Sequence, residues 1–228
     1  MPLLEGMSLT PDYAGGRENA MHADWYFDFV SPYSYLQLMA FKRLPDSLEI
    51  QYRPVLFAGL LKHWGQKGPA EIPGKRRQTY RECQWLADRA GIPFKFPDVH
   101  PFNPLRALRL CIALGTEPAV IGAIFEFIFA EGRNLQSDDE WHALAQRLEV
   151  EDADALISEP AVKERLRENT EEAVRRGVYG VPTFAVGDEL FWGADKTDML
   201  LDYLADPALF SRGEMARIDR LPMGVERS

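Results

Sequence analysis

The sequence is poor in cysteine, with only Cys83 and Cys111 in 228 residues. The two are far apart, and neither belongs to a Cys-x-x-Cys pair, so the chain lacks both a dithiol motif and a disulfide framework. Lone cysteines are most often small buried hydrophobes. We therefore expect no structural disulfide and a protein of a reducing compartment, the cytoplasm.

Histidine, net positive charge and long apolar runs are also scarce. The four histidines have no metal-ligand spacing, so we expect no metal site. A net charge of −9 argues against nucleic acid and anionic membrane surfaces as partners. No apolar run approaches the roughly 18 residues of a membrane helix. The composition is that of a globular protein, and we expect neither nucleic acid nor membrane among its partners.

The most informative stretch of the sequence is an aromatic run that ends in a serine and a proline. Tyr26 to Val30 predicts a short buried strand in which Asp28 is the only charged residue. Ser31 is a preferred N-cap, and Pro32 suits the first position of a helix. The N-terminus of a helix concentrates free N–H groups and a partial positive charge, so it can hold an anion such as a thiolate.

The chain as a whole predicts an α/β protein with a long helical segment in its middle. Strand 24–30, helix 32–43 and strand 48–54 form a βαβ unit with parallel strands. From about 78 to 177 the sequence is helical, and the pattern Ser137-x-x-Glu140 indicates a capping box. Two strands joined at Gly187-Asp188 and a helix over 196–204 follow, in the order of a β-hairpin and an amphipathic helix.

A basic segment follows the second strand. The positive residues in it are Lys62, Lys67, Lys75, Arg76 and Arg77, in a Gly/Pro-rich loop of an otherwise acidic protein. Each alone is typical of a solvated loop. As a group they could hold carboxylates.

The stretch Ser31-Pro32-Tyr33-Ser34 resembles the active-site turn of the DsbA-like branch of the thioredoxin superfamily, where Cys-x-x-Cys usually stands. Serines form neither thiolates nor disulfides, so these residues cannot exchange disulfides. The form Asp-x-x-Ser-Pro-Tyr-Ser is similar to kappa-class glutathione transferases and, more closely, to 2-hydroxychromene-2-carboxylate isomerases. Further motifs agree in order: Arg53-Pro54, Lys62, Gly65-Gln66, Lys75, Gly180-Val181-Pro182 and Gly193-Ala194-Asp195.

The resemblance implies a thioredoxin-like fold with a large all-helical insertion. Residues 23–54 and 178–209 would form the thioredoxin-like domain, and residues 55–177 the helical insertion domain. Residues 1–22 would be a flexible extension, and residues 210–228 a charged C-terminal tail.

The resemblance also implies a glutathione site. Ser31 would hydrogen-bond the glutathione sulfur and favour its thiolate, since a free thiol has a pKa near 8.5. The peptide bond between Val181 and Pro182 would be cis, and the Val181 backbone would pair with the cysteinyl part. Ala194 and Asp195 would take the γ-glutamyl end, with Asp195 also a candidate N-cap. The remaining ligands would be Lys62, Gln66 and Lys75, which lie where the family reaches carboxylates.

Two positions depart from the family pattern. Position 194 is alanine where a polar residue is common, so only its backbone N–H can serve. Position 66 is glutamine where kappa-class enzymes carry asparagine. The candidate substrate contacts are Tyr33, Trp64 and Asn103, of which the tyrosine also suits plain packing.

Together these features predict a glutathione-dependent cis-trans isomerase of 2-hydroxychromene-2-carboxylate-type aromatic carboxylates, acting as a homodimer as the family usually does. Two alternatives stay open. The same site would suit a kappa-like transferase or peroxidase, or a non-catalytic module that binds glutathione or peptide. Catalytic use of glutathione without its depletion would favour the isomerase.

Overall fold

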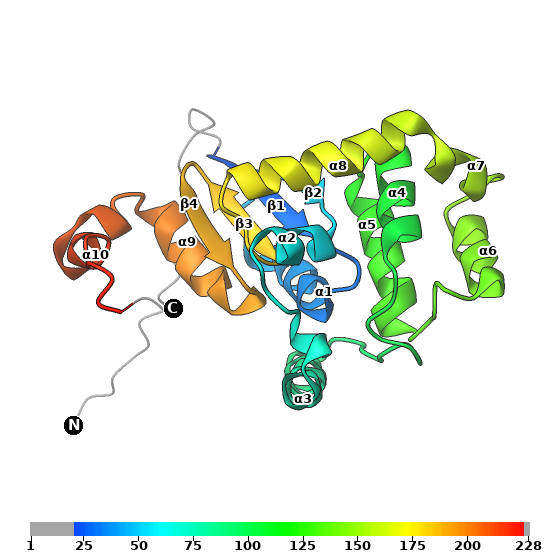
Figure 1. Cartoon of the computed structure of the whole chain (residues 1–228), viewed down its shortest axis with the longest axis horizontal. Coiled ribbons are helices and arrows are strands. Elements are labelled where there is room, and N and C mark those ends of the chain that lie inside the picture. Colours follow the sequence, from blue (N-terminus) through cyan, green and yellow to red (C-terminus); the bar gives the residue numbers. More distant parts are fainter. Residues whose placement is uncertain (1–20, 226–228) are drawn as a thin grey trace, which may run out of the picture.

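The computed structural model describes residues 21–225, which form a four-stranded mixed sheet covered by helices on both faces (Figure 1). The strands are β1 (Met21–Phe27), β2 (Leu48–Pro54), β3 (Thr183–Val186) and β4 (Glu189–Trp192). Their order in the sheet is β2-β1-β3-β4, with β1 and β2 parallel and the other pairs antiparallel. The predicted βαβ unit with parallel strands and the predicted hairpin of the last two strands are confirmed. Residues 1–20 of the predicted extension lie outside the described residues, and Met21 and His22 belong to β1.

Strand β1 lies inside the sheet, and its side chains alternate between two cores. Trp25 and Phe27 pack into the larger core, whereas Tyr26 points to the smaller one on the other face. The strand ends at Phe27 rather than at Val30, where the aromatic run of the sequence had placed its end. The reason is Asp28, whose carboxylate binds two backbone N–H groups and turns the chain.

Two helices cover each face of the sheet. Helices α1 (Pro32–Met39) and α9 (Thr197–Ala205) pack against the larger core. Helices α2 (Phe57–His63) and α8 (Pro160–Arg175) contribute Leu60 and Ala173 to the smaller one. Helix α1 begins at the carboxyl end of β1, so its N-terminus lies at the edge of the sheet where β3 begins.

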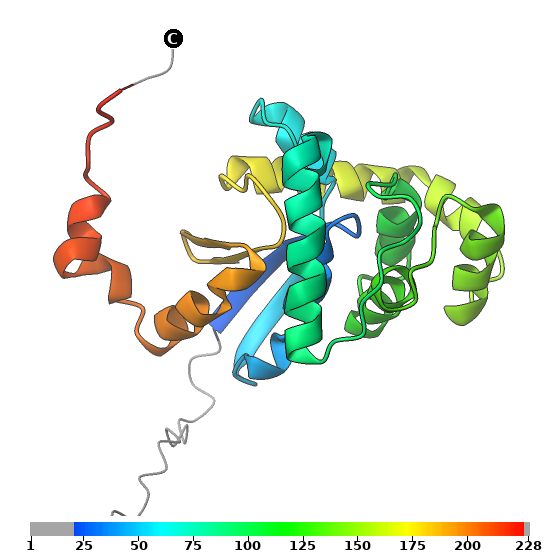
Figure 2. The ribbon, with the colours of Figure 1, turned by 90° about the horizontal axis from the view of Figure 1, so that it is seen from below.

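The helices between β2 and β3 are α2, α3 (Pro73–Ala90), α4 (Leu105–Ala113), α5 (Pro118–Phe125), α6 (Asp138–Arg147), α7 (Ala153–Ser158) and α8. Of these, α4 to α7 form a helical layer beside the sheet, at the right in Figure 2. Their aromatic core is continuous with that of the sheet, since the Phe125 ring packs at a tilt against Trp25 and Phe29, with centroids 6.4 and 4.7 Å away. The predicted helical segment is therefore confirmed.

One predicted cap is wrong. Ser137 precedes α6, but its side chain caps no N–H group. Glu140, the other half of the predicted capping box, instead accepts hydrogen bonds from the Arg133 guanidinium, at 2.9 Å for the shorter one. An ion pair across the preceding loop has replaced the local cap.

The chain after α9 contains more structure than the charged tail that the sequence predicts. A turn of 3-10 helix (Leu209–Ser211) and α10 (Gly213–Ile218) follow it, at the left in Figure 1. Across residues 21–225, no helix is both long and apolar enough to pass through a bilayer.

Candidate active site

The turn between β1 and α1 is held by Asp28. Its two carboxylate oxygens accept hydrogen bonds from the Val30 N–H at 2.9 Å and the Phe57 N–H at 2.8 Å. Its carbonyl accepts the Ser31 N–H at 3.0 Å. The side chain is fully buried, and this burial raises the pKa of Asp28 to about 7, against the opposing effect of the two backbone hydrogen bonds.

Ser31 caps α1 as the sequence predicts. Its Oγ accepts a hydrogen bond from the Ser34 N–H at 3.2 Å, and Pro32 occupies the first helical turn. The hydroxyl itself donates to the Val181 carbonyl at 3.5 Å, the outer limit of a hydrogen bond. A hydroxyl held so loosely is available to a better acceptor, at a helix N-terminus that favours an anion.

The loop before β3 completes this part of the site. The Val181–Pro182 peptide bond is cis, as predicted, and the Val181 carbonyl faces Ser31 across 3.5 Å. Within residues 21–225 no oxygen accepts the Val181 N–H. A backbone segment with an unpaired donor can take an extended peptide by strand-like pairing. The donors and acceptors present therefore fit the cysteinyl part of a short peptide such as glutathione.

Gln37 connects this loop to the segment before α9. Its side chain accepts a hydrogen bond from the Trp25 indole at 2.7 Å and donates to the Gly193 carbonyl at 3.1 Å. The Gly193 N–H in turn donates to the Pro182 carbonyl at 2.9 Å. These bonds place Ala194, a predicted ligand, beside the cis-proline loop.

Asp195 does not cap α9. Gly193 has a φ of 108°, which favours glycine, and Ala194 to Lys196 form a 3-10 turn before the helix. The carboxylate of Asp195 is exposed and pairs with Lys196, while Lys196 itself stands at the N-cap position without a side-chain cap bond. The N-cap interpretation is wrong, and the carboxylate faces solvent beside Ala194.

The three predicted ligands of the basic segment are all exposed. Lys62 lies in the last turn of α2, Gln66 in the loop after it, and Lys75 in the first turn of α3. In the described part of the chain, no acidic group pairs with any of the basic residues Lys62, Lys67, Lys75, Arg76 and Arg77. Most arginines elsewhere are paired, so this surface keeps its charge for an anion.

Trp64 connects the end of α2 to the cis-proline loop by a hydrogen bond. Its indole N–H donates to the Val178 carbonyl at 2.9 Å, and the ring is 42% exposed. Tyr179 and Trp192 lie nearby with ring centroids 5.0 Å apart, and both are exposed. An apolar surface of aromatic rings therefore borders the loop that carries Val181.

The other predicted substrate contacts have local partners. The Tyr33 hydroxyl donates to Glu82 of α3 at 2.8 Å, and burial raises the pKa of this tyrosine. The Asn103 side chain accepts the Leu105 N–H at 3.0 Å at the start of α4. Arg106, which follows Asn103 in the same segment, pairs with Asp138 on α6 at 2.9 Å. None of these three side chains makes a described contact with Ser31 or Val181.

Both cysteines are buried and free. Burial raises the pKa of Cys83 to about 12 and that of Cys111 above its usual range. Their thiols therefore stay protonated and take no part in the site.

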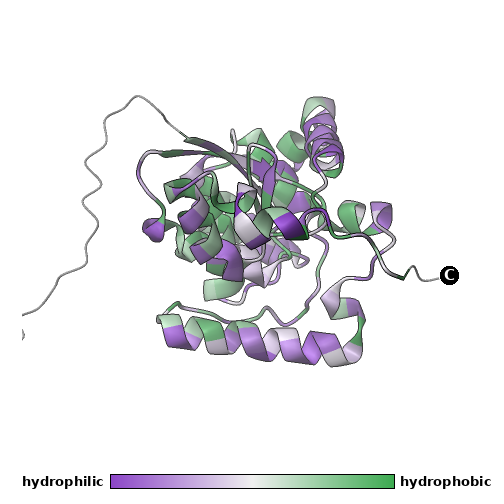
Figure 3. Cartoon of the chain, turned by 90° about the vertical axis from the view of Figure 1, so that its left-hand side faces the viewer, coloured by the Kyte–Doolittle hydropathy of each residue, from purple (hydrophilic) through white to green (hydrophobic). Residues whose placement is uncertain are grey.

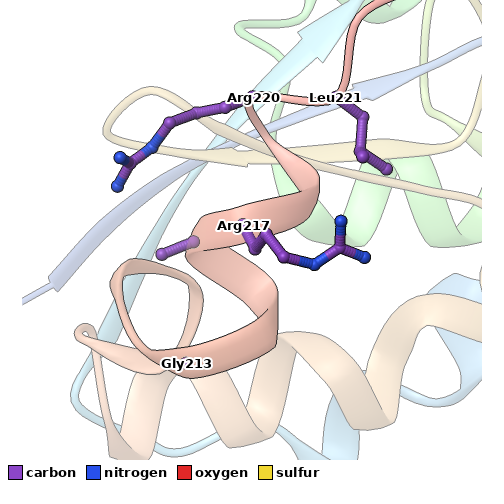
Figure 4. A pocket seen from close by; sticks show the side chains of 5 residues that line it. Gly213, Arg217, Arg220 and Leu221 are labelled. Atoms are coloured by element: carbon purple, nitrogen blue, oxygen red, sulfur yellow. The ribbon is translucent and has the colours of Figure 1, made fainter.

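Two surface hollows lie outside the Ser31 turn and the cis-proline loop. One runs along the largely hydrophilic α3, the long helix at the bottom of Figure 3, and is lined by Gly74, Arg77, Gln78, Arg81, Glu82 and Trp85. It contains Arg77 of the predicted basic segment, and its Glu82 bonds Tyr33. The other lies on α10, where Arg217 and Arg220 line it (Figure 4), and includes no predicted site residue.

From the sequence, His100 could border a substrate pocket, whereas nothing marks Gln37 or Glu82, which also shape the site. All three act through contacts between segments distant in sequence, which no local pattern encodes.

Comparisons with known proteins agree with this fold. The model of the DsbA-like thioredoxin domain matches residues 23–205. A protein of Sphingobium xenophagum named 2-hydroxychromene-2-carboxylate isomerase is 31% identical over 80% of this chain and 97% of its own. Glutathione S-transferase kappa 2 of Caenorhabditis elegans is 30% identical over 80% and 91%. A solved 2-hydroxychromene-2-carboxylate isomerase aligns with a TM-score of 0.70 at 28% identity, over 82% of this chain and 96% of that one.

Proposed function

Because the chain belongs to the DsbA-like thioredoxin family, in the branch of the 2-hydroxychromene-2-carboxylate isomerases and kappa-class glutathione transferases, we propose that it is a glutathione-dependent isomerase. Its substrates would be aromatic carboxylates of the 2-hydroxychromene-2-carboxylate type. The isomerases among its relatives supply the reaction class. The proposal adds the class of substrate and the use of glutathione to that reaction class.

The observation that carries the proposal is the pairing of Ser31 with the cis-proline loop. The Ser31 hydroxyl stands at the N-terminus of α1 and 3.5 Å from the Val181 carbonyl, so it can turn from that carbonyl to a sulfur anion. The turn has serines at both motif positions and no thiol of its own. A site arranged for a thiolate but lacking one suits a thiol brought by a small peptide.

Several residues would hold glutathione. The Val181 backbone would pair with its cysteinyl unit, and Pro182 would keep that backbone turned toward Ser31. The Ala194 N–H and the Asp195 carboxylate would take the γ-glutamyl end. The free positive charges of Lys62 and Lys75, with the Gln66 amide, would take carboxylates of the peptide or of the substrate.

When bound, glutathione supplies a thiolate that adds reversibly to a double bond of the substrate, so that the resulting single bond can rotate before elimination. The protein contributes binding, orientation and charge. Ser31 and the N-terminal amides of α1 stabilise the sulfur anion and raise the concentration of nucleophile near neutral pH. The basic segment orients the substrate carboxylate, and the exposed ring of Trp64 gives its aromatic part a surface.

A second candidate is a kappa-like glutathione transferase, favoured by the 30% identity to glutathione S-transferase kappa 2. The same groups would stabilise the thiolate, but glutathione would leave as a conjugate. Incubation of substrate with catalytic glutathione separates the two: turnover beyond the amount of glutathione added supports the isomerase. Turnover that stops when glutathione is consumed supports the transferase.

Ser31→Ala tests the role of the site. We expect the variant to bind glutathione with near-normal affinity, because most of the peptide contacts are elsewhere. Its turnover should fall on the order of 100-fold, the usual effect of removing one donor from a charged reacting centre. Loss of the N-cap costs about 1 kcal/mol of stability, which thermal unfolding measures separately. An unchanged turnover would show that Ser31 does not act on the reacting sulfur, whereas a wild type that binds glutathione without any turnover would indicate the non-catalytic binding module.

A further inference from the structure

His100 contacts the peptide group that precedes Ser31. Its Nε2 lies 2.7 Å from the Val30 carbonyl oxygen, although the two residues are 70 positions apart in sequence. A carbonyl only accepts hydrogen bonds, so Nε2 carries a proton and donates it. The imidazole thus holds one end of the turn that presents the Ser31 hydroxyl.

The orientation of this imidazole is fixed on its other side. The Tyr80 hydroxyl of α3 lies 2.7 Å from Nδ1 and 2.7 Å from the His100 carbonyl. In the tautomer of neutral His100 with hydrogen on Nε2, Nδ1 has no proton, so the single proton of the Tyr80 hydroxyl is shared between two acceptors, Nδ1 and the His100 carbonyl. Burial lowers the pKa of His100, which keeps this neutral form at neutral pH.

Aromatic rings enclose the imidazole. The centroids of Tyr80, Phe96, Phe102 and Phe129 lie 5.1, 5.3, 6.0 and 6.2 Å from that of His100, all in edge-to-face geometry. Such packing leaves the ring little room to rotate. The hydrogen bond to Val30 is therefore held by α3, by the proline-rich segment and by the helical layer together.

We propose that His100 is a positioning residue, oriented by Tyr80, which fixes the Val30–Ser31 peptide and thereby aims the Ser31 hydroxyl at a bound sulfur. This inference rests on the proposed function of Ser31 and extends it to a side chain outside the motif.

The peptide geometry explains why the contact matters. The peptide unit is planar, so holding the Val30 carbonyl also fixes the Ser31 N–H, which donates to the Asp28 carbonyl. Asp28 holds the neighbouring Val30 N–H from the other side. Without His100, the Val30–Ser31 peptide loses one of its two anchors and can tilt. A tilt would turn the Ser31 hydroxyl away while leaving Val181 and the lysines in place.

The positioning role predicts a specific separation of effects. The pKa of bound glutathione thiol and the turnover depend on the direction of the Ser31 hydroxyl, whereas glutathione affinity depends on the other contacts. Loss of the Nε2 donor should therefore raise that thiol pKa and lower kcat with little change in Kd. A merely structural histidine would change stability and leave the thiol pKa alone.

Three variants and one control test the proposal. His100→Phe keeps an aromatic ring but removes both nitrogens, and His100→Gln offers an amide N–H at similar reach. Tyr80→Phe leaves the imidazole and removes only the hydroxyl at Nδ1. His142→Gln, at an exposed histidine of α6, is the matched control. The measurements are kcat, glutathione Kd by calorimetry, and the thiol pKa from the ultraviolet absorption of the bound thiolate across pH.

We expect His100→Phe to lower kcat about 10-fold and to raise the thiol pKa by about one unit, the size of one buried hydrogen bond. His100→Gln should restore most of both, Tyr80→Phe should change both by less, and His142→Gln should match the wild type. If His100→Phe does not fold, Tyr80→Phe becomes the test, and it should raise the thiol pKa and lower kcat. Wild-type thiol pKa and kcat in folded His100→Phe, or in Tyr80→Phe alone, would overturn the inference. A wild-type protein that binds no glutathione would overturn the proposed function with it.

Discussion

The buried carboxylate of Asp28 accepts a hydrogen bond from the Phe57 N–H at 2.8 Å, which joins the end of β1 to the first turn of α2. The same side chain holds the Val30 N–H. One aspartate therefore links the turn that carries Ser31 to the helix that carries Lys62. The group proposed to meet the glutathione sulfur and a group proposed to meet a carboxylate therefore share an anchor.

Asp28 predicts a pH-dependent stability. Its pKa is raised to about 7 in the folded protein, so between about pH 4 and 7 the native state holds a proton that the unfolded chain releases. The free energy of unfolding should therefore decrease as pH rises through this window, on the order of 4 kcal/mol from this residue. Urea unfolding of the wild type and Asp28→Asn at several pH values measures it. The stability of the wild type relative to Asp28→Asn should decrease as pH rises. The control Asp98→Asn, at an exposed carboxylate, should show the same pH dependence as the wild type. A difference between the wild type and Asp28→Asn that does not change with pH would contradict the raised pKa of Asp28.

Ser31→Cys should convert the site into a trap for glutathione. The new thiol would lie at the N-terminus of α1, where its pKa is lowered, beside the Val181 backbone. With oxidised glutathione its thiolate would form a mixed disulfide and release one glutathione thiolate. Intact-mass measurement should find one glutathione per chain. The wild type is the control, since Cys83 and Cys111 are buried; an adduct no more frequent than in the wild type would place glutathione elsewhere.

Gly180 and Trp192 should be energetically coupled. A Cβ at position 180 would overlap the indole Nε1 of Trp192 and come within 3.0 Å of Cε2. Gly180→Ala should cost about 1 to 3 kcal/mol by overpacking and weaken glutathione binding, because the shift is transmitted to Val181. Trp192→Ala should relieve most of that cost, so the double variant is less destabilised than the sum of the two. Gly122→Ala, where a Cβ meets nothing within 4 Å, is the control. Additive losses of unfolding free energy in the double variant would show that the two residues are not coupled.

Lys62→Met should weaken glutathione binding and leave kcat unchanged. The ammonium lies at the exposed end of α2 without an ionic partner among residues 21–225, so its charge is available to a ligand carboxylate. Exposed pairs contribute up to about 1 kcal/mol, which corresponds to a rise in Kd of about three- to fivefold. The effect should fade at high salt. Lys163→Met, at an exposed lysine of α8, should bind like the wild type; equal losses in both variants would indicate a general charge effect.

Local sequence predicted the fold well wherever a boundary was set by its own residues. Ser31 and Pro32 define the start of α1, and Gly91 ends α3 with a φ of 64°. Boundaries set by distant partners were missed. The apolar run continues to Val30, but Asp28 ends β1 by binding the Phe57 N–H. Likewise the Ser137 capping box failed because Glu140 pairs with Arg133.

The residues of the candidate site also fall into those that local motifs predict and those that distant contacts position. Motifs placed Ser31, Val181 and Pro182, and the structure brings these three together. The positions of Glu82 and His100 depend on how α3 and the proline-rich segment pack against α1, and the role of Gln37 depends on the segment before α9. The bonds Glu82–Tyr33, His100–Val30 and Gln37–Gly193 join residues between 49 and 156 positions apart, which no local periodicity encodes.

The burial of both cysteines has a practical consequence for the chain in an oxidising cell. With each thiol kept protonated and enclosed, peroxides and alkylating agents find no reactive cysteine on the folded chain. Under the proposed mechanism, oxidation of glutathione would then lower turnover, and fresh reduced glutathione would restore it without reduction of the protein's own cysteines.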